Sequence, residues 1–487
     1  MTESDPLAAY VVDAVLGEHE FARADGTIVT IPLDPGAPYR ATPVNELGAT
    51  VTRLVWESAG SELPMHELAA VTTTLAAIAS AAPARRVALR AAETRDGVVL
   101  DLADRDEVRG AIHVTASGWE RVDPREVAIL FGSTCATEAL PIPTREGSRD
   151  MLAELLGLSP SSVEFRQVWA WLVCALFASM PRPLLTVTGP QGAGKSTLAR
   201  MVKSVIDPAL GRTGREGGLG PAPTDDEATN TTTAESHFVP AWDNVARVSG
   251  DTADWLASLV TGATTIRQAA AGPSVLTLRR AGIITAQATP GGLAADVTER
   301  LVTVDLDRIP ASARRTERAL WDEFHAQHAA ILGALLDDVA GVLANLDRVS
   351  STGVELSRLA DYHEHLVALD LHHGTDPHQP ESYAATYAAS VAADELTAED
   401  AFPVAVANLA AGGWEGTATE LRDALAPARP TRAGAVWPSG PSQTSAELSR
   451  HAEALRALGV TVRRTTRDGG RRRLYVLDRN LTAMPTP

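Results

Sequence analysis

Gly189-Pro-Gln-Gly-Ala-Gly-Lys-Ser196 is the stretch that decides the fold of this 487-residue chain. An apolar, strand-like run over 184–188 precedes it, and a helical pattern over 195–206 follows it. Glycines in such a turn let successive backbone N–H groups point inward, and the first turn of the helix adds its positive dipole end. The order of strand, glycine loop and helix therefore predicts a phosphate-binding loop within an α/β domain.

Lysine usage supports this interpretation. Of 43 basic residues, only Lys195 and Lys203 are lysines, and the other 41 are arginines. A compact ammonium suits the β- and γ-phosphates of a nucleotide, where the planar arginine fork is not equivalent. The Ser196 hydroxyl is expected to bind Mg²⁺, so we predict ATP and Mg²⁺ as cofactors. Lys203 has no role that the sequence assigns. The predicted nucleotide contacts in the loop are Gly189, Pro190, Gln191, Gly192, Ala193, Gly194, Lys195, Ser196 and Thr197.

A second acidic residue is expected at the end of a neighbouring strand, where it would hold the metal through water. Asp243 ends the mostly apolar run 237–242, although Pro240 is disfavoured inside a central strand. The alternative is an aspartate in a strand-end turn. Asn244 stands where many P-loop ATPases carry a glutamate, and an asparagine can position water but cannot accept its proton. Slow hydrolysis, or a base such as Glu235, is therefore expected.

Composition excludes several classes of protein. A hydrophobic fraction of 45% indicates a globular chain, and two cysteines cannot build a disulfide framework or a cysteine-rich metal site. The N-terminus lacks the basic region of a signal peptide, and the apolar run 168–180 is too short to span a bilayer, so we expect a cytoplasmic protein without a membrane partner. The net charge of −18 argues against general nucleic-acid binding but leaves room for a local basic site.

The chain divides into regions of different pattern. We expect a P-loop core with helical flanks, a small mixed α/β domain before it and a basic domain after it. Residues 401–487 carry a net charge of +5, whereas the remainder carries −23. Their helical patterns over 417–425 and 442–458, followed by strand patterns over 460–464 and 472–477, are typical of a winged helix. The expected domains are 1–145 (accessory), 146–310 (ATPase core), 311–400 (helical lid) and 401–487 (winged helix).

The predicted hairpin of the last domain is rich in arginine. Backbone phosphates of DNA are the natural partner of such a tip, and binding should weaken steeply with salt. The alternatives are a solvated basic hairpin or a winged helix that docks on protein. The arginines predicted to bind DNA here are Arg463, Arg464, Arg467, Arg471, Arg472 and Arg473.

The order of motifs over about 150–345 resembles the superfamily 3 helicases, AAA+ proteins of phages and plasmids. The motifs are Gly189–Ser196, Trp242-Asp243-Asn244, Leu259–Arg267, Gly282–Gln287 and Asp296–Val302. The resemblance implies a hairpin over 264–280 that grips DNA in a central channel. The cations implied for that hairpin are Arg267, Arg279 and Arg280.

The same resemblance implies roles near the γ-phosphate. Thr285 and Gln287 occupy the position of a polar sensor, which is usually an asparagine. Arg300 matches an arginine finger that reaches the ATP of the next subunit and so implies a ring, by analogy a hexamer. The alternative for Arg300 is a local ion pair with Asp296 or Glu299. Lys195, Asp243, Asn244 and Arg300 are thus the candidate catalytic residues.

Three functions are compatible with these patterns. The first is an ATP-dependent DNA helicase or translocase that replicates a phage, plasmid or integrated element. The second is an ATP-switched initiator or loader that marks DNA without processive unwinding, which the asparagine at position 244 favours. The third is a signalling or defence ATPase whose last domain contacts protein.

Overall fold

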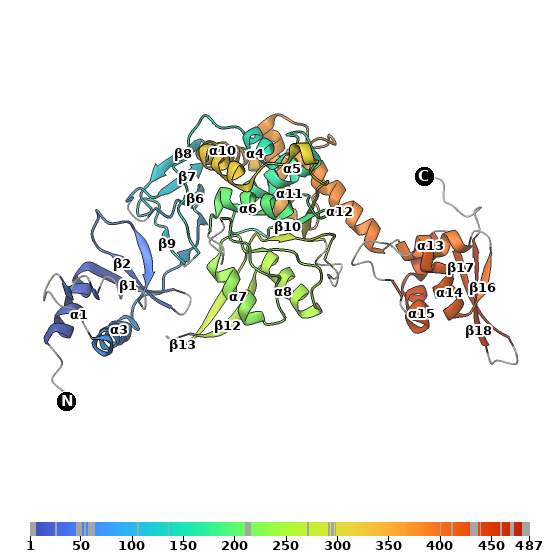
Figure 1. Cartoon of the computed structure of the whole chain (residues 1–487), viewed down its shortest axis with the longest axis horizontal. Coiled ribbons are helices and arrows are strands. Elements are labelled where there is room, and N and C mark those ends of the chain that lie inside the picture. Colours follow the sequence, from blue (N-terminus) through green and yellow to red (C-terminus); the bar gives the residue numbers. More distant parts are fainter. Residues whose placement is uncertain are drawn as a thin grey trace.

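The structure is a computed structural model of the chain, with mixed α/β architecture (Figure 1). It describes residues 6–24, 27–44, 51–52, 55–56, 64–104, 107–134, 136–209, 216–269, 272–290, 293, 297, 299–399, 401–410, 413–428, 437–438, 440–457, 460–467 and 472–479. The sequence-based expectations for Asp296, Arg471 and the predicted hairpin tip at 468–470 lie outside these residues.

The N-terminal region contains a five-stranded sheet with helices packed beside it. The helices α1 (Pro6–Glu18) and α3 (Met65–Ala79) pack through Val11, Val15, Val71 and Leu75. The sheet has the order β1-β2-β3-β9-β4, in which β1 and β2 form an antiparallel hairpin. Its strands are β1 (His19–Ala24), β2 (Thr27–Pro32), β3 (Arg40–Pro43), β4 (Val87–Ala88) and β9 (Leu130–Gly132).

A second, antiparallel sheet follows, with both faces covered. Its strands, in order along the sheet, are β5 (Ala91–Glu93), β6 (Gly97–Asp101), β7 (Ala111–Thr115) and β8 (Gly118–Val122). Because side chains alternate along a strand, Val98, Leu100 and Ile112 join the central core, whereas Val99 and Ala111 pack with Phe131. The apolar core therefore runs without a break across the expected domain boundary at residue 145.

The central sheet is parallel, and its strands are mostly apolar. Its order is β11-β14-β10-β15, formed by β10 (Leu184–Thr188), β11 (Ala241–Trp242), β14 (Ile283–Thr285) and β15 (Leu301–Asp305). Nearly continuous apolar strands are typical of a parallel sheet buried on both faces. Pro240 precedes β11 rather than interrupting it, which is a position that proline tolerates. The strand β14 thus lies between β10, which leads into the glycine loop, and β11, which leads to Asp243.

Helices and a hairpin surround this sheet. One of the helices, α6 (Lys195–Ile206), lies where the sequence predicts it, and α5 (Val163–Ala175) precedes β10 in the chain. The helix α7 (Glu227–Ser236) follows α6 along the chain, and its first turn is capped by the Asp226 side chain. The helix α8 (Gly250–Thr261) leads into the antiparallel hairpin of β12 (Ala263–Ala269) and β13 (Gly272–Leu278), which extends away from the sheet in Figure 1.

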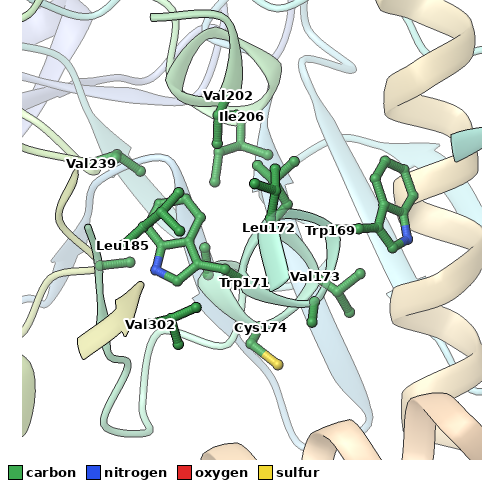
Figure 2. Packing of buried hydrophobic residues seen from close by; sticks show 14 of the residues in the cluster. Trp169, Trp171, Leu172, Val173, Cys174, Leu185, Val202, Ile206, Val239 and Val302 are labelled. Carbon is green, nitrogen blue, oxygen red and sulfur yellow. The ribbon is translucent and has the colours of Figure 1, made fainter. Parts of the chain in front are cut away.

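The core between α5, α6 and the sheet is built around tryptophans (Figure 2). Trp171 lies among Leu185, Val202 and Val302, and its indole N–H donates to the Pro183 carbonyl at 2.8 Å. Trp169 faces the opposite side of α5 and donates to the Asp338 carboxylate at 2.6 Å. Each buried indole therefore has the hydrogen-bond partner that burial requires.

A helical region covers the central sheet. Its long central helix, α10 (Glu317–Asn345), packs on α4 (Arg149–Leu156), α5 and the second sheet, and it is followed by α11 (Ala360–His373) and α12 (Tyr383–Glu399). Among the described residues, one stretch, Glu317–Ser351, is long and apolar enough to cross a membrane, and 61% of its apolar window is buried inside the protein. That burial is typical of a core helix.

The C-terminal part is a separate unit that α12 joins to the rest (Figure 1). Its sheet has the order β16-β18-β17, formed by β16 (Trp414–Gly416), β17 (Val460–Arg467) and β18 (Arg472–Arg479). Its helices are α13 (Ala401–Ala410), α14 (Ala418–Leu425), α15 (Pro441–Arg450) and α16 (Ala452–Ala457). The single helix expected over 442–458 is wrong, because the backbone leaves helical geometry at His451 and divides it in two.

Candidate functional site

The glycine loop lies between β10 and α6, at the carboxyl edge of the central sheet. Gly189, Gly192 and Gly194 adopt φ values of 137°, 84° and 82°, which L-residues rarely adopt. Gly194 precedes α6 and has no side chain that could cap it. The first N–H groups of that helix therefore point toward the loop without a capping acceptor. The backbone at 189–197 therefore forms a concave set of donors suited to phosphate oxygens.

Close packing requires glycine at the start of the loop. A Cβ at Gly189 would lie 2.3 Å from the carbonyl oxygen of Leu306, which follows β15. The Leu306 N–H donates to the Thr188 carbonyl at 2.9 Å, so the two segments run side by side. The loop is thus held from one side by the strand adjacent to β10.

Lys195 folds over the loop that carries it. Its ammonium donates to the carbonyl oxygens of Gly189 and Pro190, at 2.8 and 2.9 Å. Both acceptors are neutral, and Pro190 is exposed, so an anionic phosphate would compete for the same ammonium with a stronger, charge-assisted hydrogen bond. Lys195 can therefore exchange its present partners for a bound phosphate.

Asp243 meets two hydroxyl groups at the same edge of the sheet. The Ser196 hydroxyl donates to Asp243 Oδ1 at 2.7 Å, and the Thr285 hydroxyl donates to the same oxygen at 2.5 Å. Ser196 lies in the first turn of α6, Asp243 follows β11 and Thr285 ends β14, so three separate elements converge. A hydroxyl and a carboxylate at this spacing are hard oxygen donors that fit Mg²⁺.

Thr285 has both of its hydrogen-bonding functions filled. While its hydroxyl donates to Asp243, the same oxygen accepts the Asn244 N–H at 2.9 Å. The side chain is 1% exposed, and it therefore orients the Asp243 carboxylate rather than facing the loop. Gln287, two residues later, is exposed, and its carbonyl accepts the Gly189 N–H at 3.4 Å.

Asn244 is exposed beside this cluster in the left-handed region, with φ of 56°. Asparagine tolerates that conformation better than a glutamate would. The backbone is fixed there because the flanking Val245 N–H donates to the Thr285 carbonyl at 2.8 Å. The position thus favours asparagine for conformational reasons, independent of any catalytic role.

Arg300 lies at the opposite end of the sheet from the loop. It immediately precedes β15, which is parallel to β10, and its guanidinium donates to the Ala257 carbonyl of α8 at 2.7 Å. A five-residue strand spans about 16 Å. Arg300 is therefore separated from the glycine loop of its own chain by about the length of one strand. Glu299, one of the two partners weighed for Arg300, pairs instead with Arg358.

The arginines of the predicted DNA hairpin differ in their surroundings. Arg279 and Arg280, at the base of β13, donate to backbone carbonyls that include Thr261 at 3.1 Å and Ala234 at 3.0 Å. They thereby hold the hairpin to α8 and α7. Arg267 pairs with Ser274 in the register of β12 and β13, and its side chain lies outside the described ones.

In the C-terminal sheet, Arg463 and Arg464 lie on β17. The Arg464 guanidinium donates to the Ser449 hydroxyl of α15 at 3.0 Å and lies 5.5 Å from the centre of the Tyr475 ring. This contact connects the strand to α15. The other arginines expected here belong to β17 and β18, but their side chains lie outside the described ones: Arg467, Arg472 and Arg473.

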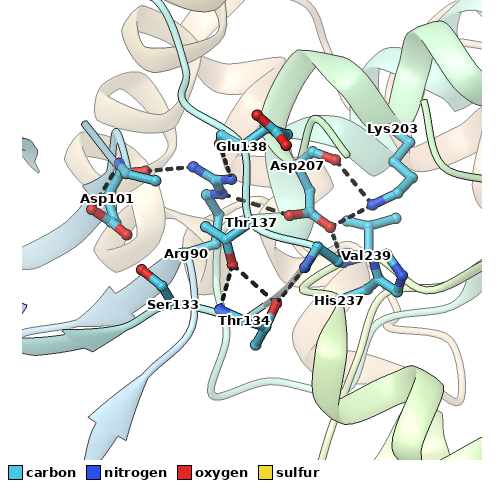
Figure 3. A network of polar contacts seen from close by, with 12 residues as sticks. Arg90, Asp101, Ser133, Thr134, Thr137, Glu138, Lys203, Asp207, His237 and Val239 are labelled. Carbon is cyan, nitrogen blue, oxygen red and sulfur yellow. Dashed lines mark hydrogen bonds and ion pairs between the residues drawn. The ribbon is translucent and has the colours of Figure 1, made fainter. Parts of the chain in front are cut away.

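Lys203, the second lysine, lies in a buried ionic network that the sequence does not reveal (Figure 3). Its ammonium contacts Asp207 Oδ2 at 2.6 Å within α6, and Asp207 Oδ1 lies 3.6 Å from Arg90 Nε. Val239 also donates its N–H to Asp207, at 2.9 Å. The i, i+4 spacing of Lys203 and Asp207 is a sequence signal, but Arg90 is more than a hundred residues away.

Burial determines the protonation of this network. It acts to raise the pKa of Asp207, but attraction from Lys203 and Arg90 outweighs burial and leaves that pKa below its ordinary value. Burial also lowers the pKa of Lys203, and it lowers the pKa of nearby His237 to about 4. His237 is therefore neutral near pH 7.

Comparison with known proteins adds a family to this geometry. Residues 149–394, just over half of the chain, match the family described as the actinomycete integrative conjugative element replication protein. Residues 402–485 match the C-terminal domain of RepA from the same class of element. No curated protein matches the chain.

Solved structures resemble the chain only distantly. The apo C-terminal region of NrS-1 covers 98% of this chain and 100% of its own, at 11% identity and a TM-score of 0.42. The JCV helicase covers 46% of this chain and 65% of its own, at 12% identity and a TM-score of 0.25. Both TM-scores lie below 0.5, so neither structure is used to assign the fold. The fold is described from the strand order of this chain alone. Because residues 149–394 contain the glycine loop, the parallel sheet and the helices that follow, the chain belongs to the replication proteins of actinomycete integrative conjugative elements.

Proposed function

We propose that this replication protein is an ATP-dependent DNA helicase or translocase of the superfamily 3 type, acting in the cytoplasm as a ring, by analogy a hexamer. The observation that carries the proposal is the convergence of Ser196 and Thr285 on one oxygen of Asp243, beside the glycine loop. A loop for phosphates and a hydroxyl–carboxylate pair for Mg²⁺ are the two halves of a P-loop nucleotide site.

Each residue then has a task set by its position. The 189–197 backbone and Lys195 would bind the ATP phosphates, and Ser196 and Asp243 would hold Mg²⁺, which supplies charge neutralisation when bound. Thr285 would keep the Asp243 carboxylate in place, and Asn244 would position water. Each assignment follows from a contact or a conformation of the site described above.

The position of Arg300 supports the proposed ring. Since Arg300 and the glycine loop lie at opposite ends of parallel strands, Arg300 can serve only a nucleotide bound to a neighbouring subunit. Its present acceptor, the Ala257 carbonyl, is a neutral group that the phosphate of a neighbour would replace with a stronger partner.

DNA would be bound at two places. We place the contact of the β12–β13 hairpin at Arg267, because Arg279 and Arg280 already hold the hairpin base. The C-terminal unit, with its helices and a basic strand pair, supports a winged-helix domain over 401–487 that engages duplex DNA. Arg463, Arg467 and the β18 arginines are its candidate phosphate contacts.

The test is an ATPase assay with and without single-stranded DNA, combined with measurement of particle size in the presence of ATP. A motor hydrolyses ATP faster with DNA and assembles, and Lys195→Ala abolishes the hydrolysis. Asp322→Ala, which removes an exposed ion-pair partner of Arg318, is the folded control. Hydrolysis that is slow and indifferent to DNA would contradict the motor.

A second candidate function has its own observation. Asn244 cannot accept a proton, and its left-handed backbone disfavours the glutamate that fast ATPases use. An ATP-switched initiator or loader would bind ATP, assemble and grip DNA with little turnover. DNA affinity that rises with ATP while turnover stays low would favour this function over the motor.

A further inference from the structure

The segment that follows β15 closes over the glycine loop. The Leu306 N–H donates to the Thr188 carbonyl at 2.9 Å, and the Ile309 N–H donates to the Gly192 carbonyl at 3.3 Å. Ile309 also packs beneath the loop, because its Cδ1 lies 3.0 Å from where a Cβ at Gly194 would stand. The backbone on both sides of Arg308 is therefore fixed against the phosphate loop.

The Arg308 side chain lies beside the middle of that loop. Its Nε is 4.0 Å from the position that a Cβ would take at Gly192. The side chain is exposed, and no hydrogen bond or ion pair joins its guanidinium to any residue that the structure describes. Lys195, by contrast, has two carbonyl partners within the loop.

Two carboxylates share this segment with Arg308. Asp305 and Asp307 are both exposed, and Asp305 accepts the Thr188 hydroxyl at 2.7 Å. Their negative charges would repel a polyphosphate bound to the loop nearby. Arg308 lies between these two aspartates in the sequence, and its side chain faces the loop. Its positive charge would therefore offset the repulsion at the place where the phosphates would lie.

We infer that Arg308 is a second nucleotide-binding cation, which contacts the phosphates shared by ATP and ADP from the same subunit that supplies Lys195. The inference rests on the proposed function, because it needs a nucleotide in the loop. It adds a residue of the same chain to the site, distinct from Arg300, which would act on a neighbour.

The choice of phosphate follows from the position along the loop. In this kind of loop the backbone N–H groups cradle the α- and β-phosphates, whereas the lysine reaches the β- and γ-phosphates. Arg308 stands beside Gly192, three residues before Lys195, and so belongs with the backbone cradle. A guanidinium can hold two phosphate oxygens at once, which a lysine ammonium cannot match geometrically.

The experiment is isothermal titration calorimetry of the full chain with ATP and with ADP, each with Mg²⁺. Arg308→Ala should weaken both nucleotides by a similar factor of about 10- to 100-fold, the range for hydrogen bonds to charged groups. Arg308→Lys should recover part of the loss, because it keeps the charge and loses the fork. Arg314→Ala is the matched control, since Arg314 is another exposed arginine six residues along the same linker.

The outcomes separate the two proposals. If Arg308→Ala binds both nucleotides as the wild type does, or if Arg314→Ala weakens them equally, Arg308 is not a site residue, although the ATP site stands. A loss confined to ATP would move Arg308 to the terminal phosphate and contradict its assignment. If the wild type binds neither nucleotide, the proposed function itself fails.

Discussion

Replacement of Asp207 by alanine tests the buried network of Figure 3 directly. The variant removes the carboxylate that Lys203 contacts at 2.6 Å, that Arg90 approaches to 3.6 Å and that accepts the Val239 N–H at 2.9 Å. Both cationic side chains are at most 1% exposed. Bulk water therefore reaches neither cation in the folded wild-type protein.

The expected loss can be worked from these contacts. Breaking a buried ion pair by removing one partner costs about 3–5 kcal/mol, because an uncompensated charge stays buried. The orphaned Val239 N–H adds about 1 kcal/mol or more. Domains are commonly stable by only about 5–15 kcal/mol, so Asp207→Ala should bring the core close to unfolding at room temperature.

Two further variants give the prediction its internal control. Lys203→Met should cost less, about 1–3 kcal/mol, since Asp207 keeps both Arg90 and the Val239 N–H. Asp322→Ala removes an exposed partner of Arg318 and should have no measurable effect, because both side chains are at least 70% exposed.

Urea denaturation followed by tryptophan fluorescence is the assay, since Trp169, Trp171 and Trp242 are all buried in the central core. The reasoning is refuted if Asp207→Ala unfolds within about 1 kcal/mol of the wild type, well below the range for a broken buried pair. It is also refuted if Lys203→Met is the more damaging of the two, because Asp207 would then not be the centre of the network.

Three other perturbations are predicted from single contacts. Gly189→Ala should destabilise the protein by more than about 2 kcal/mol, because its Cβ would meet the Leu306 carbonyl at 2.3 Å in addition to the strain of positive φ. Thermal unfolding measures the loss, with Gly157→Ala as the comparison, because that variant has the strain without the clash. Equal losses in the two variants would contradict the prediction. Thr285→Val should lower ATP turnover about tenfold while ADP affinity, measured by calorimetry, stays unchanged, since only the orientation of Asp243 is lost; weaker ADP binding would mean that Thr285 contacts nucleotide. Burial lowers the pKa of His328 to about 4, below its unfolded value of about 6.5. Stability should therefore fall as pH drops from 6.5 to 4, and His328→Phe should flatten that decline by up to about 1.4 kcal/mol per pH unit, whereas an unchanged slope in urea titrations would rule out His328.

The sequence predicts the glycine loop and its flanking strand and helix because all the information is local. Strand 184–188 and helix 195–206 agree with β10 and α6 residue by residue, since their apolar periodicity and the loop glycines specify one solution. The pairing of Ser196 with Asp243 spans 47 positions. The order of the motifs suggests this pairing, but the contact itself depends on the order of the strands in the folded sheet.

Other features could not be predicted from the sequence, for identifiable physical reasons. The start of α7 is not evident from the sequence, because Thr and Gly dominate 211–234 and the Asp226 cap outweighs their low helix propensity. The roles of Arg279 and Arg280 at the hairpin base depend on carbonyls from distant elements. Charge counts alone cannot distinguish an arginine that holds a fold from one that faces a ligand.

The second antiparallel sheet has a consequence for anyone who produces this protein in pieces. The family match begins at Arg149, and a fragment that starts there would look complete by sequence. It would nevertheless lose Trp119, whose indole donates to Asp337 of α10 at 2.8 Å, and would open the apolar side of α10 to water. Exposed apolar area of that kind drives aggregation. A well-behaved fragment should therefore begin upstream of Ala91, so that the whole second sheet, β5 to β8, is retained as the permanent cover of the core.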